Sequence, residues 1–389
     1  CISQKEMHQS VEKTAQELDL EDLLDHAPGE LSGGQKQRVS MAGVMIDRVE
    51  ILLFDEPLAN LDPASGKRTI DLIDRIQKND HTTIVIIEHR LEDVLYRDVD
   101  RIIVIGDGKI AADSKPDALL TTSVLEAEGI REPLYLTACK YMDIPVLEER
   151  KPQHVETFDL TGMEEKAQKW YHEAQVQSCK PEGETLLELQ QTGFGYLPGQ
   201  QVLQNISFQV KKGEMLSIVG KNGAGKSTMS SLICGFLTPT EGHMIYRGQD
   251  MKNWSIKERG EKIGFVMQSP NQMISKPMIF DEVALGLVIR QIPEAEIKER
   301  VNQVLKICGL YEMRNWPVSA LSFGQKKRVT IASILVMEPE MMILDEPTAG
   351  QDYRHYTEIM EFLKKLNQEA GITIIMITHD MHLMLEYTD

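Results

Sequence analysis

The sequence predicts an α/β fold built on a mainly parallel sheet, and it predicts that this fold occurs twice in tandem. One observation is a set of short apolar runs of strand length, most of them followed by a stretch with helical spacing of apolar residues. A second is a glycine-rich loop at 220–225 that joins one such run to a predicted helix. The third is an internal repeat, in which several motifs return 290 positions later.

The glycine-rich loop has the pattern of a phosphate-binding loop (P-loop). Residues 215–234 read MLSIVGKNGAGKSTMSSLIC, which is an apolar run, the motif G-x-x-x-x-G-K-[ST] and a helix-like segment. The glycines allow backbone N–H groups to point at phosphate oxygens, and the helix N-terminus adds partial positive charge. We expect Lys226 to reach the β- and γ-phosphates of a nucleoside triphosphate and the Ser227 hydroxyl to ligate Mg²⁺. The nucleotide-binding residues predicted here are Gly220, Asn222, Gly223, Ala224, Gly225, Lys226, Ser227 and Thr228.

Composition restricts the class of protein further. The chain has 389 residues, enough for two or three domains, and a net charge of −18, which argues against non-specific nucleic-acid binding because that needs a basic surface. Its five cysteines are scattered without a C-x-x-C pair, which suits a reduced protein better than a disulfide framework or a zinc site. No apolar run approaches the ~20 residues needed to cross a bilayer, so we expect any membrane role to be peripheral.

The repeat predicts the domain organisation. Four pairs match in one register: LSGGQKQRV at 31–39 with LSFGQKKRV at 321–329, ILLFDEP at 51–57 with MMILDEP at 341–347, Asp62 with Asp352, and His89 with His379. In that register the counterpart of Lys226 would precede the first residue, so we expect a piece of a longer tandem protein. The predicted parts are the C-terminal part of a first domain without its P-loop (1–112), an acidic linker (113–184) and a second domain without its C-terminal end (185–389).

The elements of the first copy follow from periodicity and helix signals. In order, we predict a helix over 5–25, a helix opened by LSGGQ, a strand buried on both faces over 49–54, a helix over 71–78, a strand over 82–87, a helix start at 91–94, and a strand and turn over 101–108.

The pattern weakens between 112 and 184, where fifteen acidic residues face eight basic ones. A solvated acidic connector is the favoured interpretation, and docking of this segment on the two domains is the alternative. A helix over 160–177 would carry Trp170 and Tyr171. The second copy then opens with strands over 186–189, 202–210 and 215–219.

An Asp-Glu pair after an apolar strand is the second nucleotide signal. Asp345 is expected to hold Mg²⁺ through water, and Glu346 to orient and deprotonate the attacking water. The four apolar residues before the pair and the proline after it make an ordinary surface pair an unfavourable interpretation.

The LSGGQ motif distinguishes between classes of P-loop protein. Its serine and glycines at a helix N-terminus form a second anion site, about a hundred residues from the P-loop in a complete copy. Together with the P-loop and the Asp-Glu pair, it resembles the ATP-binding cassette (ABC) family over 1–112 and 185–389. The resemblance implies a P-loop ATPase fold of ABC type with a helical subdomain, and two domains that pair head to tail within the chain. Each LSGGQ segment then closes over the other domain's P-loop.

The resemblance also implies roles for individual residues. Tyr196 would stack on adenine, although an ordinary aromatic at a strand end is the alternative. Gln268 matches the Q-loop glutamine, which contacts Mg²⁺ and the attacking water. His379 matches the switch histidine that contacts the γ-phosphate. The segments 59–62 and 349–352 match the D-loops, which cross the seam between the two domains.

One complete ATP site is therefore expected. It combines the second copy's residues Lys226, Ser227, Thr228, Gln268, Asp345, Glu346 and His379 with Ser32, Gly33, Gly34 and Gln35 from the first copy. The other site would use Glu56 and His89 with the segment 321–325, in which Phe323 replaces the usual glycine. We expect that second site to be weaker rather than inactive.

The segment 269–286, SPNQMISKPMIFDEVALG, resembles the energy-coupling factor (ECF) subclass of importer ATPases. That resemblance implies a peripheral ATPase at the cytoplasmic face of the cell membrane. Its partners would be an integral-membrane scaffold subunit and a substrate-capture subunit for a vitamin, a vitamin precursor or a metal ion. The scaffold would contact an exposed apolar surface around Met273, Ile274 and Met278.

Tandem ABC ATPases that act on ribosomes are the alternative from another class. Their linkers are commonly basic, whereas the linker here is net negative, which opposes a role at RNA. A DNA-repair ATPase would need a long coiled-coil insertion between the P-loop and the LSGGQ-type segment, and the sequence has none.

Overall fold

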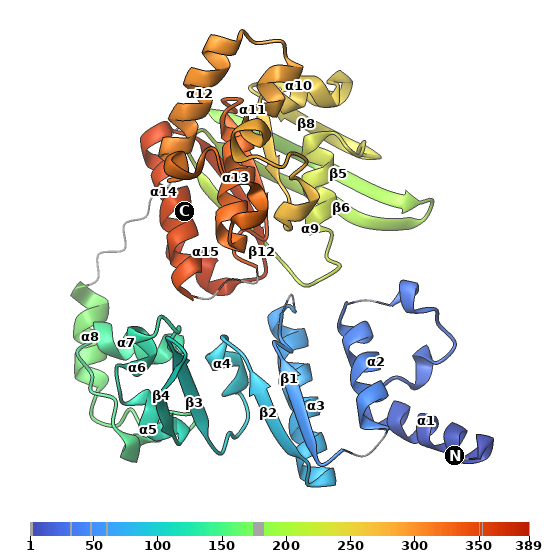
Figure 1. Ribbon diagram of the computed structural model, residues 1–389, viewed down its shortest axis with the longest axis vertical. Coiled ribbons are helices and arrows are strands. Elements are labelled where there is room, and N and C mark those ends of the chain that lie inside the picture. The colour runs from blue at the N-terminus through green and yellow to red at the C-terminus, as the bar shows by residue number, and fades with distance from the viewer. Residues whose placement is uncertain are drawn as a thin grey trace. The chain divides into compact units, whose positions relative to one another are not determined.

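The computed structural model describes residues 3–31, 33–46, 49–59, 61–173, 183–349, 351 and 353–388. The chain forms two compact units, Cys1–Gln175 and Val176–Asp389, each with its own sheets and helices (Figure 1).

The second unit is organised by a parallel sheet. Its strands are β7 (Met215–Val219), β10 (Ile263–Val266), β11 (Met341–Asp345) and β12 (Thr373–Thr378). They pair in the order β10-β11-β12-β7, and every pair is parallel. Val266 pairs with Leu344, Asp345 with Ile377, and Thr378 with Val219, so all four strands end at one edge.

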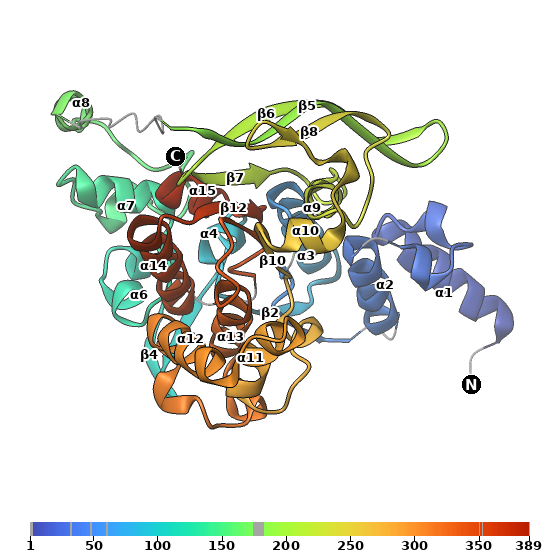
Figure 2. The same ribbon diagram turned by 90° about the horizontal axis from the view of Figure 1, so that it is seen from above.

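A second, antiparallel sheet covers one face of the parallel sheet. It consists of β5 (Thr185–Leu197), β6 (Gln200–Lys211), β8 (Glu241–Tyr246) and β9 (Gln249–Asp250), in the order β6-β5-β8-β9. Figure 2 shows β5, β6 and β8 on one side of β7 and β12, with α13 (Phe323–Leu335) and α14 (Tyr353–Ala370) on the other side. The remaining helices of this unit are α9 (Lys226–Cys234), α10 (Ile256–Gly260), α11 (Ile279–Ile289), α12 (Glu294–Ile307) and α15 (Met381–Tyr387).

Alternation along the strands divides the core of the second unit in two. Met341 and Ile343 of β11 belong to a cluster with the antiparallel sheet and α9, whereas Met342 and Leu344 belong to a cluster with α11–α14. Every residue of β12 is buried. The apolar runs of the second copy are therefore strands with both faces covered, as is usual for parallel sheets.

The first unit repeats part of this arrangement. Its elements are α1 (Gln4–Glu17), α2 (Gly33–Met45), β1 (Ile51–Asp55), α3 (Pro63–Asp80), β2 (Thr83–Ile87) and α4 (Leu91–Val94). Strands β1 and β2 are parallel and pair Asp55 with Ile87, the register of Asp345 with Ile377 shifted by 290 positions. The predicted helix over 5–25 ends at Glu17 because Asp19 has a left-handed backbone (φ 52°), and the helix predicted over 71–78 starts earlier, at Pro63, behind the N-cap Asp62.

The prediction that strand 49–54 is buried on both faces is wrong for the described residues. Ile51 is 64% exposed and Leu53 65% exposed, and Val85 and Ile87 of β2 are exposed beside them. Their counterparts in the second copy pack under the antiparallel sheet and α9. Among the described residues of the first unit, none forms an equivalent layer over this face of β1 and β2.

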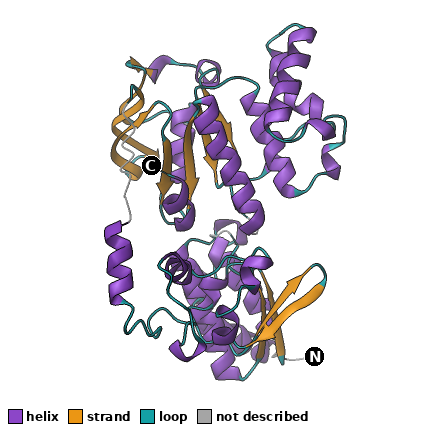
Figure 3. Ribbon diagram, turned by 90° about the vertical axis from the view of Figure 1, so that its left-hand side faces the viewer, coloured by secondary structure: helices purple, strands orange, loops and turns teal. Residues whose placement is uncertain are grey.

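The predicted acidic connector is largely folded, so the interpretation as a solvated segment is also wrong. A hairpin of β3 (Ile102–Gly106) and β4 (Lys109–Ser114) leads into α5 (Pro116–Leu120), α6 (Val124–Ala127), α7 (Leu134–Tyr141) and α8 (Glu164–Glu173), as Figure 3 shows by secondary structure. The buried residues of this region include Leu119, Leu120, Leu125, Leu136, Cys139, Ile144, Phe158 and Met163. The core of this region is formed by apolar residues scattered irregularly among acidic ones, and such a pattern gives no periodicity in the sequence. Helix α8 confirms the helix predicted over 160–177 for residues 164–173, with Trp170 and Tyr171 exposed on it. The helix starts later than predicted, and 174–177 lie outside the described residues.

Among the described helices, none combines the length and the apolar character needed to cross a membrane.

The folded middle region makes a stability prediction. Leu136→Ala removes a fully buried side chain, so we expect it to destabilise the first unit by about 2–5 kcal/mol. Leu160→Ala, at an exposed leucine of the same region, is the matched control and should change stability by less than about 0.5 kcal/mol. Urea unfolding followed by circular dichroism measures both. Equal effects of the two substitutions would restore the connector interpretation.

Candidate nucleotide site

The P-loop has a backbone shape that its glycines make possible. Gly223 and Gly225 have positive φ angles of 79° and 92°, and a Cβ atom at Gly225 would lie 2.7 Å from Leu203 Cδ2. Lys226, the first residue of α9, folds its side chain back over the loop, where Nζ donates to the carbonyl of Gly220 (2.7 Å) and to that of Lys221 (3.1 Å). The ammonium group is thus held at the loop whose N–H groups are predicted to bind phosphate.

Two predicted Mg²⁺ ligands lie together at the edge of the sheet. The Ser227 hydroxyl donates to Asp345 Oδ2 at 3.5 Å, joining the start of α9 to the end of β11. Burial, and then the charge of Glu346, raise the pKa of Asp345. No cluster of three His, Cys, Asp or Glu residues suited to a metal occurs in the described parts of the chain. A hydroxyl and a carboxylate fit Mg²⁺, which prefers oxygen ligands and completes its shell with phosphate and water.

Glu346 and His379 form a direct pair. Glu346 is only 8% exposed and has a left-handed backbone (φ 45°), and its N–H donates to the carbonyl of Ile377 (2.8 Å). His379 Nδ1 lies 2.7 Å from Glu346 Oε1, and the Thr378 hydroxyl donates to Oε2 (3.3 Å). Such a backbone is uncommon for glutamate and is retained where the surroundings enforce it. The sequence predicted both residues, but not that they contact each other.

Tyr196 and Gln268 approach the same region from other elements. Tyr196 lies near the end of β5 with its ring exposed and its hydroxyl 3.3 Å from Thr228 Oγ1, in the first turn of α9. An exposed ring beside the P-loop helix suits the predicted contact with adenine. Gln268 follows β10, and its carbonyl accepts a hydrogen bond from Lys327 (2.9 Å).

Lys327 is a residue of this site that the sequence reasoning missed. It lies in α13, one turn after the motif LSFGQ, and is 1% exposed. Its Nζ donates to the carbonyls of Met267 (2.8 Å) and Gln268 (2.9 Å). Burial lowers the pKa of Lys327 to about 8, against the opposing effect of Asp345 and Glu346. Its position four residues before Ile331 places a lysine on the buried stripe of the helix, and that spacing was the available signal.

The two LSGGQ-type segments begin helices. Gly33 and Gly34 open α2 and Gln35 follows them, whereas Ser32 lies outside the described residues, as do Asn60, Gly350 and Asp352 of the D-loops. In the second copy, Ser322 caps α13 by accepting from the Gln325 N–H. Phe323, the first residue of α13, is partly exposed. The first copy's segment and the P-loop belong to different units, and their meeting in one site stays a prediction.

The first copy repeats the backbone of the Glu-His pair but not its side-chain contacts. Glu56 has a left-handed backbone (φ 47°), and its N–H donates to the carbonyl of Ile87 (2.9 Å), as at Glu346. His89 Nδ1, however, lies 3.8 Å from Glu56 Oε1 and 3.6 Å from Glu88 Oε1. Glu88 occupies the position of Thr378 and has a buried side chain. One histidine therefore faces two carboxylates.

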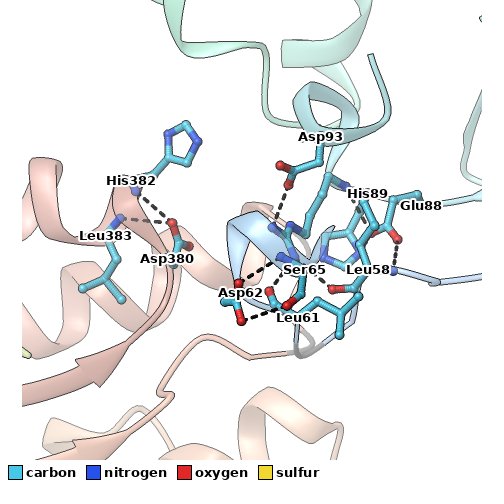
Figure 4. Close-up of polar contacts among 11 residues, drawn as sticks. Leu58, Leu61, Asp62, Ser65, Glu88, His89, Asp93, Asp380, His382 and Leu383 are labelled. Atoms are coloured by element: carbon cyan, nitrogen blue, oxygen red, sulfur yellow. Dashed lines mark hydrogen bonds and ion pairs between the residues drawn. The ribbon is translucent and has the colours of Figure 1, made fainter. Parts of the chain in front are cut away.

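Glu88 and Arg90 connect this histidine to the D-loop of the first copy. Glu88 accepts from the N–H groups of Leu58 (3.3 Å) and Arg90 (3.4 Å). The Arg90 guanidinium donates to the carbonyls of Leu58 (2.9 Å) and Leu61 (3.4 Å) and pairs with Asp93. Figure 4 labels Leu58, Leu61, Glu88, His89 and Asp93 from this network. In the second copy the position of Arg90 is occupied by Asp380, which instead caps α15 by accepting from the N–H groups of residues 382 and 383.

The sequence predicted an exposed apolar surface around Met273, Ile274 and Met278, and the structure corrects that prediction. All three side chains are half-buried, and Met273 and Ile274 pack against the core of the second unit. Met273 Sδ also accepts from the Met267 N–H (3.2 Å). These side chains therefore support the Q-loop from within rather than forming an exposed surface.

Comparison with known proteins agrees with this geometry. A family model described as "ABC transporter" matches residues 2–59 and 203–349. The chain belongs to the ABC transporter ATP-binding proteins. Members of this family hydrolyse ATP, so the predicted ABC-type P-loop fold and ATPase activity are confirmed. A second model, described as "ATP-binding cassette cobalt transporter", matches residues 122–194.

Relatives of this ABC protein are similar along the whole chain. A putative ABC transporter ATP-binding protein of Clostridium perfringens is 57% identical over 389 residues, which are 100% of this chain and 68% of the relative. One of Enterococcus faecalis is 58% identical over 390 residues, again 100% and 68%. The solved structure of cbiO1 from Clostridium perfringens, part of the ABC transporter complex cbiONQ, is 39% identical. It covers 53% of this chain and 83% of its own, with a TM-score of 0.51.

The buried carboxyl group of Glu88 predicts a pH dependence of stability in the first unit. Burial raises the pKa of Glu88 above its ordinary value of 4.5, against the opposing effects of His89, Arg90 and the Leu58 N–H. The folded state then holds the proton more tightly than the unfolded state, so stability falls as pH rises above about 4.5 and through the folded-state pKa. Glu88→Gln lacks this titration.

We therefore expect the melting temperature of the wild type to fall relative to that of Glu88→Gln as pH rises from 5 towards neutrality. Thermal unfolding at a series of pH values measures the difference. Glu12→Gln, at an exposed glutamate of α1, controls for general effects of pH. A difference that is constant or moves the other way would contradict the burial argument.

Proposed function

We propose that this chain is the ATP-hydrolysing part of an ECF-type importer, in which two cassettes of one polypeptide drive uptake of a small solute through membrane subunits. The observation that carries the proposal is the match of residues 122–194 to a family described as an ATP-binding cassette cobalt transporter. Most of these residues lie in sequence between the two cassettes, and those up to Met163 contribute to a buried core. The similarity to cbiO1, described as part of the complex cbiONQ, supports it. Among vitamins, vitamin precursors and metal ions, these observations favour a metal ion.

The proposed partners are an integral-membrane scaffold subunit and a substrate-capture subunit, and the proposed place is the cytoplasmic face of the cell membrane. The half-buried Q-loop methionines leave the scaffold to contact exposed residues of this segment, such as 271–272 and 275–277. The ribosome-associated alternative loses support, because its basic helical linker is replaced here by a folded acidic region that matches a transport family.

In the proposed mechanism, Tyr196 stacks on adenine and the P-loop N–H groups bind the phosphates. Lys226 exchanges its contacts with the Gly220 and Lys221 carbonyls for phosphate oxygens. Ser227, Asp345 and Gln268 would hold Mg²⁺, which neutralises phosphate charge when bound. Gly33, Gly34 and Gln35, with Ser32, would close over the γ-phosphate from the first copy, so that ATP joins the two cassettes.

Glu346 is the proposed general base. Water attacks the γ-phosphorus, its proton passes to the Glu346 carboxylate, and the bond to the β–γ bridging oxygen breaks. His379 and Thr378 hold the two carboxylate oxygens and so fix the direction of the group. The site built on Glu56 and His89 is proposed to be slower, because Glu88 shares the histidine and Phe323 stands at the N-terminus of α13.

The general-base role predicts the behaviour of Glu346→Gln. The amide keeps the shape of the side chain but cannot take the proton, so we expect ATP binding to persist and turnover at this site to fall by about 10²–10⁴-fold. Phosphate release measures turnover, and cross-linking of the two cassettes measures closure. Glu369→Gln, at an exposed glutamate of α14, is the control. Undiminished turnover in Glu346→Gln would refute the role.

The transport proposal predicts which proteins bind to this one in the cell. Affinity purification of the full-length protein from membranes should recover integral-membrane subunits, and proteoliposomes of that complex should accumulate labelled Co²⁺ only with ATP and an intact Glu346. Recovery with ribosomes and without membrane subunits would favour the alternative class. Uptake of a labelled vitamin instead of Co²⁺ would correct the solute but keep the importer.

A further inference from the structure

The Lys327 ammonium is buried, and within the described part of the chain its hydrogen bonds go to two backbone carbonyls, those of Met267 and Gln268. Burying an ammonium group costs much more free energy than burying an apolar side chain of the same length. Packing alone therefore gives no reason for a lysine at this position. The reason lies in the groups that it holds.

These two carbonyls belong to the residues that follow the last residue of β10, Val266. The chain there leaves the parallel sheet and enters the Q-loop, so the strand ladder no longer fixes the backbone. Lys327 supplies two donors at that point, at 2.8 and 2.9 Å. The direction of the Gln268 side chain depends on this stretch of backbone.

The same side chain lies within electrostatic reach of the catalytic carboxylates. The charges of Asp345 and Glu346 favour the charged form of the Lys327 ammonium and so oppose the lowering of its pKa by burial. Lys327 also belongs to α13, the helix that begins at the LSFGQ segment. One residue therefore connects the helix of this segment, the backbone of the Q-loop and the charge of the Asp-Glu pair.

The equivalent helix position in the first copy also carries a side chain that donates to a backbone carbonyl. The counterpart of Lys327 is Gln37 in α2, and its amide also donates to a backbone carbonyl of a catalytic loop, that of Pro57 (2.5 Å), directly after Glu56. A hydrogen-bond donor to a backbone carbonyl thus occurs at this helix position in both copies.

We propose that Lys327 is a positioning residue for ATP hydrolysis, which fixes the Q-loop backbone and so sets the direction of the Gln268 side chain relative to the reacting phosphate. The inference rests on the role proposed above for Gln268. If a membrane partner displaced the Q-loop, the two hydrogen bonds from Lys327 would transmit that movement to α13 and to the LSFGQ segment at its start.

Lys327→Met in the full-length protein tests the inference, since methionine keeps the apolar stem and removes the donors. We expect kcat to fall by about tenfold or more, because small misplacements of catalytic groups have effects of this size, while KM for ATP changes less than about twofold. Lys327→Gln, which carries the first copy's donor, should recover part of the loss. An unchanged kcat in Lys327→Met overturns the inference.

Thr330→Val is the matched control. Thr330 is equally buried in α13, and its hydroxyl donates to the Lys327 carbonyl (2.8 Å) without touching the Q-loop. We expect it to lower the melting temperature but to leave kcat within about twofold, as for a loss of stability alone. A loss of kcat in Thr330→Val equal to that in Lys327→Met would show a general effect of the helix and overturn the inference.

A double-mutant cycle with Gln268→Ala separates this inference from the proposed function. If Lys327 acts through Gln268, adding Lys327→Met to Gln268→Ala should change kcat by less than about twofold. Independent, multiplying losses overturn the inference and leave the role of Gln268 standing. Full activity of Gln268→Ala by itself overturns both. If Lys327→Met does not fold, Lys327→Gln takes its place in the same cycle.

Discussion

Parallel pairing of β10, β11, β12 and β7 decides where chemistry takes place in the second unit. Because the four strands run in one direction and end in register, the residues that follow them gather at one edge of the sheet. The P-loop follows β7, Gln268 follows β10, Asp345 and Glu346 close β11, and His379 follows β12. Segments separated by more than 150 residues thereby meet, and the two apolar clusters on either face of the sheet hold them in place.

At this edge of the sheet, the positive charge of Lys327 lies among the negative charges of Asp345 and Glu346, and all three side chains are at least partly buried. Burial raises the pKa of Asp345 and lowers that of Lys327, and each group favours the charged form of the other. Lys226 lies folded onto the P-loop carbonyls nearby. Charges in such surroundings interact more strongly than in water. The Ser227 hydroxyl joins this group through its hydrogen bond to Asp345 (3.5 Å).

The two copies show how a duplicated framework diverges. Both copies keep the same backbone at the glutamate after the strand. Glu56 and Glu346 each have a left-handed backbone, and the N–H group of each donates to a carbonyl of the neighbouring strand, that of Ile87 and that of Ile377. The side chains around it differ, since a buried glutamate at 88 takes the place of Thr378 and links the histidine to the D-loop. Backbone geometry here is conserved between the copies, whereas the electrostatics of the histidine are not.

The sequence by itself determined the P-loop, the Asp-Glu pairs and the repeat, and through them the ABC-type fold. Each of these is a local pattern whose spacing directly reflects a loop, a strand end or a duplication. Three features were decided by tertiary structure alone. The contact between Glu346 and His379 depends on strand pairing, the core of the acidic middle region depends on leucines scattered among charges, and the exposure of Ile51 and Leu53 depends on which layers cover a strand. Lys327 belongs with them in one respect: helical spacing signals its burial, but its hydrogen bond to the Gln268 carbonyl depends on packing between segments about 60 residues apart.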